Sequence, residues 1–213
     1  MSIIAPAKPS VATFELPLAE ATPDSLNGYG LLVDDYKAQE IEIVPWPAPG
    51  RRPLDPGTGD QGGVAEGIFE FWWAGEILYG RNHAVESERY LLGWSRDPDE
   101  ASEVAENPDR SKILLWHANY HPDGGQLFYP ANREAFVAPL ALPGDDIKPE
   151  NFVAFYFDGA RGLYIHPNIW HEGVFPLAET ARFFDKQGKV HARISCDLLQ
   201  EFGTYLSLPL RRP

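Results

Sequence analysis

The sequence predicts an all-β domain, and three observations support that prediction. Glycine (19) and proline (20) make up about 18% of the 213 residues, against roughly 12% in average usage. Short apolar runs recur between turn clusters, most regularly from Lys112 onward. Hydrophobic residues make up 44% and aromatic residues 13%, which is enough to build a core. Short strands at near-regular spacing indicate a sandwich, jelly roll or barrel.

The expected elements follow the chain in order. A brief helix is expected after the potential N-cap at Pro23-Asp24-Ser25, because Gly28 and Gly30 follow at once. Segment 67–79 has the highest aromatic density and predicts a hairpin that turns near Ala74-Gly75. The remaining strands are expected at 14–18, 31–33, 90–94, 113–117, 126–129, 135–140, 152–157, 163–165 and 191–198.

We expect a single domain over residues 1–213, with its core at about 112–199. Residues 44–63 are dominated by proline and glycine and are expected to form a loop insertion. Residues 97–109 hold six acids and almost no large apolar side chains, so they predict a second, solvated insertion.

Charge narrows the classes of partner. The formal net charge is −13 and the pI is about 4.8. This balance disfavours nucleic acid and anionic membrane as partners, because both need clustered lysine and arginine. A small carboxylate substrate remains possible, since a few local cationic side chains can override net charge inside a pocket.

Cysteine usage and hydropathy predict a cytoplasmic location. Cys196 is the single cysteine, so no internal disulfide can form. The first ten residues lack a charged n-region followed by an apolar h-region. No run of 18 or more apolar residues occurs, so no membrane span is expected.

Two segments place polar residues at the spacing of the cupin motifs. The first cupin motif spaces its polar residues as His-x-His followed by Glu, and Asn119, His121 and Gln126 stand at those positions. Period-2 alternation directs Asn119 and His121 to one face of a strand, with His117 in phase. In the second motif, within segment 162–176, His171 stands at the position of the histidine. The spacing therefore predicts one interior pocket around these residues.

The segment from Asn119 to Pro176 also resembles the ureidoglycolate lyases. In that family a His-Pro-x-Gly-x-Gln segment precedes an extended run ending in proline, as at residues 121–130 here. The further matches are Tyr29-Gly30, Phe136-Val137-Ala138-Pro139, the Gly144-Asp145-Asp146 turn and Tyr164-x-His166-x-x-x-Trp170-His171.

The resemblance implies a fold and an activity. The fold is a cupin-type double-stranded β-helix (a jelly-roll barrel) with a few short helices. The activity is cleavage of ureidoglycolate to glyoxylate and urea in allantoin (purine) catabolism, by a homodimer. His121 and His171 are the expected acid and base, because imidazole exchanges protons near neutral pH. The expected substrate-binding residues are Asn119, Gln126, Tyr164, His166 and Trp170.

Departures from the family pattern keep two alternatives open. Family members often carry an acid where Asn119 stands and a histidine where Glu172 stands, which leaves room for a non-catalytic protein that binds small carboxylates. Glu172 is expected on the face opposite His171, away from the chemistry. Metal-binding cupins usually present three His and one Glu, whereas neutral amides are poor ligands. No cofactor is therefore expected to be required. The second alternative is a metal-dependent enzyme with a weak divalent ion at His121, Gln126 and His171.

Overall fold

Two β-sheets make up most of the protein. The computed structural model describes residues 11–44, 50–59, 61–85, 88–190 and 192–213. The ten-stranded sheet has the order β1 (Ala12–Glu15), β17 (Thr204–Pro209), β7 (Lys112–Leu115), β6 (Tyr90–Trp94), β5 (Ile77–Asn82), β4 (Gln61–Ala74), β15 (Thr180–Val190), β9 (Gln126–Pro130), β12 (Gly162–Ile165), β3 (Gly30–Val33). The seven-stranded sheet has the order β16 (Ile194–Asp197), β8 (His117–Tyr120), β13 (Trp170–His171), β10 (Phe136–Ala141), β11 (Val153–Phe157), β2 (Leu18–Glu20), with β14 (Phe175–Pro176) paired to β10.

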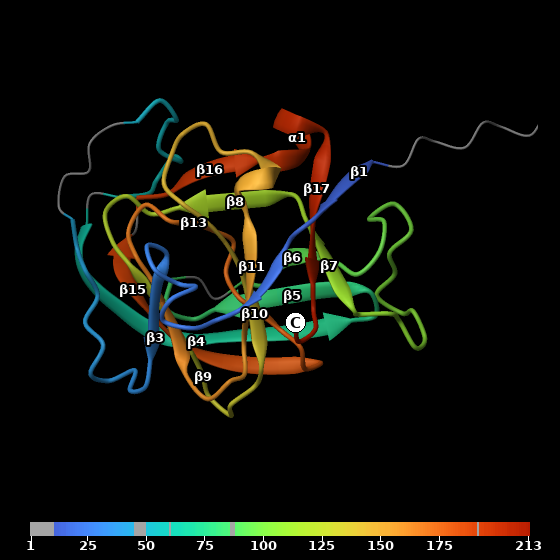
Figure 1. Cartoon of the computed structure of the whole chain (residues 1–213), viewed down its shortest axis with the longest axis horizontal. Helices are drawn as coiled ribbons and strands as arrows, with labels where there is room; N and C mark the ends of the chain where they lie inside the picture. The colour runs from blue at the N-terminus through green and yellow to red at the C-terminus, as the bar shows by residue number, and fades with distance from the viewer. Residues whose placement is uncertain (1–10, 45–49, 60, 86–87, 191) are drawn as a thin grey trace, which may run out of the picture.

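The two sheets pack against each other through aromatic side chains. Phe136 of β10 meets Phe183 of β15 edge to face, with ring centroids 5.1 Å apart. Phe183 in turn lies 5.4 Å from Phe71 of β4. All three are nearly fully buried, and edge-to-face pairs add to the free energy of burial. Figure 1 shows β8 and β16 in one layer and β4, β5 and β9 in the other.

The all-β prediction is confirmed, and the two packed sheets are consistent with the expected cupin-like fold. The hairpin at 67–79 is present as β4 and β5, which pair up to Ala74↔Ile77. The expected strands at 31–33, 90–94, 126–129, 135–140, 152–157 and 163–165 correspond to β3, β6, β9, β10, β11 and β12. No helix in the described part of the chain is long and apolar enough to cross a membrane.

The expected strand at 113–117 is in fact two strands. It breaks at Trp116, so that β7 pairs with β17 and β6, whereas β8 pairs with β13 and β16. A strand that bends at a corner can pass from one sheet to the other. This change of sheet brings His117, Asn119 and His121 onto the layer that faces β9 and β15.

Other differences concern the helices and several expected strands. Residues 23–29 form turns and no helix, with Gly28 at φ 87°. The expected strand 14–18 is divided between β1 and β2. The expected strand 191–198 is shorter in the structure: His191 lies outside the described residues, and β16 starts at Ile194. The only α-helix of the described chain, α1 (Leu198–Phe202), begins after the N-cap Asp197. A 3-10 turn spans Pro149–Asn151. The sequence analysis missed β15 and β17.

Candidate functional site

A cavity of about 370 Å³ lies between the two sheets. That volume is in the usual range for a small-molecule site. One side, which we call the histidine wall, consists of residues of the seven-stranded sheet and of the loops after β8 and β13: His117, Asn119, His121, His171 and Glu172. The facing side, which we call the amide wall, consists of residues of the ten-stranded sheet: Asn82, Gln126 and Gln187. The four positions predicted from the cupin motifs therefore line one cavity.

His121 and His171 form the centre of the histidine wall. Their ring centroids are 5.0 Å apart, and both residues are more than nine-tenths buried. Nδ1 of His121 donates to the carbonyl of Ala192 (3.2 Å), and Nδ1 of His171 donates to the carbonyl of Ile169 (2.7 Å). Because a carbonyl can only accept, each Nδ1 carries a proton. In the neutral ring the lone pair is then on Nε2, which is the atom available for proton transfer.

The expectation that Glu172 points away from the chemistry is wrong. β13 ends at His171, and Gly173 adopts φ 109°, so the period-2 rule of a strand does not extend to Glu172. Its Oε2 accepts from His117 Nδ1 at 2.7 Å and from Asn119 Nδ2 at 3.3 Å. Burial alone lowers the pKa of His117, but the charge and hydrogen bond of Glu172 outweigh burial and raise that pKa above its ordinary value.

A buried carboxylate that the sequence analysis missed lies behind the amide wall. Asp185 of β15 is 1% exposed. Its Oδ1 accepts from Gln126 Nε2 at 2.8 Å, and its Oδ2 accepts from Gln187 Nε2 at 2.9 Å and from Asn82 Nδ2 at 3.1 Å. The signal for it in the sequence was weak, because polar residues at Asp185 and Gln187 interrupt the apolar alternation that marks an inward-facing strand.

Arg193 supplies a positive charge at the same cavity. Its Nε donates to Asp55 Oδ2 at 2.7 Å, and that oxygen also accepts from Ser195 Oγ at 2.6 Å. Its backbone N–H donates to Thr58 Oγ1 at 3.0 Å. Among the described residues, no acceptor is bonded to the two Nη groups of Arg193. Residues Asp55 and Thr58 belong to the expected loop insertion 44–63, so this loop positions a residue of the pocket.

Three predicted binding residues lie outside this cavity. Trp170 is fully buried and donates its Nε1 to the carbonyl of Gly144 at 2.8 Å. Tyr164 packs with Leu127 in a second small core, accepts at its hydroxyl from the N–H of Glu42 at 2.9 Å, and contacts the ring of His166. Neighbouring strand residues face opposite ways. His171 points into the cavity, so Trp170 points away from the cavity and packs in the hydrophobic core. The expectation that Trp170 lines the pocket is therefore corrected.

The donor atoms bear on the metal-dependent alternative. Within the part of the chain that the structure describes, no three His, Cys, Asp or Glu side chains are arranged to hold a metal ion. Gln126 gives its Nε2 to Asp185, which leaves only a neutral oxygen beside the Nε2 atoms of His121 and His171. Two imidazoles and one amide form a weak set for a transition metal. Metal-free chemistry remains a prediction.

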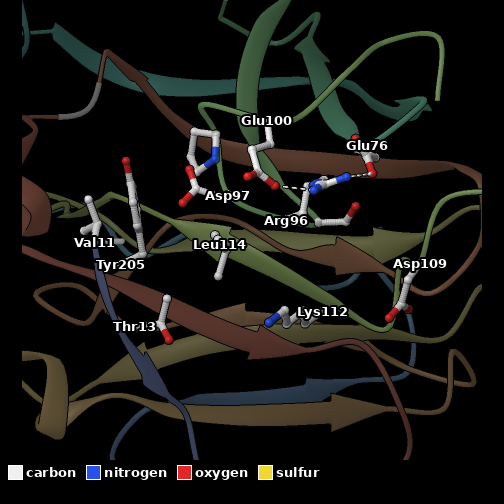
Figure 2. A pocket seen from close by; sticks show the side chains of 12 residues that line it. Val11, Thr13, Glu76, Arg96, Asp97, Glu100, Asp109, Lys112, Leu114 and Tyr205 are labelled. Carbon is white, nitrogen blue, oxygen red and sulfur yellow. Dashed lines mark hydrogen bonds and ion pairs between the residues drawn. The ribbon is translucent and has the colours of Figure 1, made fainter. Parts of the chain in front are cut away.

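A larger cavity of about 500 Å³ lies elsewhere, beside the acidic insertion 97–109. Figure 2 shows Arg96 between Glu76 and Glu100, and these groups pair with one another. Glu76 also accepts from the N–H of Ser102 at 3.0 Å, which fixes the insertion to the sheet. Among its described lining residues there is no histidine. The smaller cavity, which histidines line, is therefore the better candidate for a site of proton transfer.

Fold and cavity together define an all-β protein with a buried acid–base pocket of small-molecule size. Comparison with known proteins narrows this class to one family of similar sequences. The family model for ureidoglycolate lyase matches residues 104–200, just under half of the chain. Over 70 residues the chain is 43% identical to a ureidoglycolate lyase of Salmonella enteritidis PT4 (strain P125109) and 41% identical to one of Salmonella newport (strain SL254).

Each match spans 32% of this chain and 42% of the relative, so the chain covers less than half the length of these curated relatives. The resemblance to the ureidoglycolate lyases is confirmed over residues 104–200, which contain both histidines of the pocket and Asp185.

Proposed function

We propose that this protein is an enzyme that cleaves ureidoglycolate to glyoxylate and urea. The observation that carries the proposal is the pair of buried histidines, His121 and His171, whose rings line one cavity with their centroids 5.0 Å apart. The similarity of residues 104–200 to ureidoglycolate lyases supports the choice of substrate.

The reaction needs one base and one acid. Ureidoglycolate carries a hydroxyl, a ureido nitrogen and a carboxylate on one carbon. A base removes the hydroxyl proton, the oxygen forms the carbonyl of glyoxylate, and the carbon–nitrogen bond breaks. The departing nitrogen takes up a proton and leaves as urea, so atoms and charge balance without water or an oxidant.

His121 and His171 can divide these two roles. Two positive rings with centroids 5.0 Å apart would repel each other, which disfavours the state in which both rings are protonated. The neutral ring accepts the hydroxyl proton at Nε2, and the protonated ring donates to the ureido nitrogen. A positioned acid or base of this kind contributes about 10²–10⁴ in rate.

The rest of the pocket holds the two ends of the substrate. Arg193 offers Nη donors that suit a carboxylate. Asn119 presents Oδ1, a buried acceptor that no described donor reaches, to a hydroxyl or N–H of the substrate. Family members often carry an acid at the position of Asn119 and a histidine at the position of Glu172. Here an imidazole and a carboxylate still lie beside this site, but they come from His117 and Glu172.

A direct test is incubation of the purified protein with ureidoglycolate. We expect glyoxylate and urea in equal amounts, at a rate far above the spontaneous decay measured without protein. Saturable binding of ureidoglycolate or glyoxylate with no release above that background would favour the carboxylate-binding alternative. The proposal also includes a homodimer in the cytoplasm, as the resemblance and the cysteine usage imply.

A further inference from the structure

We infer that Asp185 sets the substrate specificity of the pocket by fixing the amide groups of Gln126 and Gln187 so that their oxygens face the ligand and select a ureido group. This inference rests on the proposed function and deepens it. Asp185 is a positioning residue, because it is 1% exposed and acts through the two glutamines that line the cavity.

The orientation of each amide follows from the chemistry of a carboxylate. An ionised carboxylate accepts hydrogen bonds and donates none. Asp185 accepts from Gln126, Gln187 and Asn82 at 2.8–3.1 Å. Rotating either glutamine amide by half a turn would place an amide oxygen against a carboxylate oxygen, which is repulsive. One buried carboxyl group therefore determines the orientation of three amides.

The two glutamines then present acceptors to the cavity. Gln126 and Gln187 are neighbours across β9 and β15, which pair them directly. With Nε2 of each turned to Asp185, Oε1 of each is left for a ligand, and no donor among the described residues is bonded to either oxygen. The third amide differs, because Asn82 Oδ1 already accepts from the N–H of Ala84 at 3.0 Å. The amide wall is thus a pair of acceptors.

A pair of acceptors selects a ligand by its donors. A ureido group ends in an NH₂ group and carries a second nitrogen with one hydrogen, and each of these N–H bonds can donate a hydrogen bond. A methyl or ester group of the same shape would leave both oxygens buried without a partner, and an unsatisfied buried acceptor is costly. The amide wall and the histidine wall face each other, so a ureido group on the former places the reacting carbon towards the imidazoles.

The test is binding of two stable analogues. Ureidoacetate (N-carbamoylglycine) lacks the hydroxyl and cannot react, and N-acetylglycine replaces its terminal NH₂ with a methyl group. By calorimetry we expect the wild type to bind ureidoacetate at least about tenfold more tightly than N-acetylglycine, as two lost hydrogen bonds imply. In Asp185→Asn the new amide can pair with a rotated glutamine, and the ratio should fall to within about threefold.

Two further variants separate specificity from stability. Gln187→Met leaves Asp185 and Gln126 in place and removes one acceptor, so the ratio should fall about threefold even if Asp185→Asn does not fold. Lys186→Met is the matched control. Lys186 lies next to Asp185 on the same strand, is 9% exposed, and holds the carbonyls of Tyr36 and Gln39 from the other face. This variant should keep the wild-type ratio.

The outcomes distinguish the two proposals. A wild type that releases glyoxylate but binds both analogues equally would overturn the specificity inference and leave the activity standing. An unchanged ratio in a folded Asp185→Asn or Gln187→Met would also overturn the inference. Selective binding of ureidoacetate without turnover of ureidoglycolate would support the amide wall while refuting the catalytic proposal.

Discussion

The ion pair of His117 and Glu172 makes a contribution to stability that depends on pH. Glu172 raises the pKa of His117 above its ordinary value of 6.5. A raised pKa means that the folded state binds the proton more tightly than the unfolded state. The stabilisation is therefore fully present below about pH 6.5, and it is lost as pH rises through the raised pKa of folded His117. Glu172→Gln removes it.

The magnitude follows from the geometry of the pair. A hydrogen bond to a charged group contributes about 1.5–3 kcal/mol. The side chains of His117 and Glu172 are 27% and 14% exposed and lie 2.7 Å apart, so partial solvation reduces the expected loss to about 1–2 kcal/mol. In a chain of this length 1 kcal/mol corresponds to about 2–4 °C in Tm. Glu172→Gln should therefore lower Tm by about 2–8 °C near pH 6.

The assay is thermal unfolding followed by circular dichroism between about pH 6 and pH 9, across the titration range of histidine. Near pH 9 the loss should be less than about half as large, because glutamine can still accept from a neutral His117. Glu70→Gln is the control. It removes the carboxylate of a more exposed cluster, in which Glu70 pairs with His83 at 3.0 Å and with Arg182 at 3.4 Å, and the three side chains are 32%, 41% and 59% exposed. This change should shift Tm by less than about 2 °C. A Glu172→Gln deficit that stays constant or grows with pH would refute the reasoning.

Four further predictions concern activity and assembly. His171→Ala and His121→Ala, each shown to fold by circular dichroism, should lower kcat for glyoxylate release by about 10²–10⁴. In the control His166→Ala, which changes a residue outside the cavity, kcat should stay within about threefold of the wild-type value. A folded His171→Ala variant that keeps most of its activity contradicts the assignment. Arg193→Met should raise KM about tenfold with a smaller change in kcat, since it removes binding to the carboxylate of the substrate. Saturation kinetics in which kcat falls about tenfold and KM stays unchanged would exclude that role. Dialysis against EDTA should leave turnover within about twofold, and a loss restored by one divalent metal would favour the metal-dependent alternative. Light scattering should give about 48 kDa, twice the chain mass of 23.8 kDa, and a monomer would contradict the homodimer.

Local periodicity was enough to predict part of the site. Asn119 and His121 share a face because strand side chains alternate, and both line the cavity, Asn119 within β8 and His121 directly after its end. The same rule applied to Trp170 and His171 would have placed Trp170 outside the pocket. It did not apply to Glu172, because β13 is two residues long and Gly173 turns the chain. A side chain beyond the end of a strand is not placed by the alternation within that strand.

The sequence by itself determined the β class, most of the strands and the histidines that face the interior, because these depend on turn residues and on alternation within a few positions. Only the tertiary structure decided which groups meet those histidines. Asp185 lies 59 residues after Gln126, and the bond of His117 to Glu172 spans 55 residues. Arg193 meets Asp55 across 138 residues. These contacts depend on which strands lie side by side in two sheets, and that order is fixed by the packing of the whole core, which no local pattern of residues encodes.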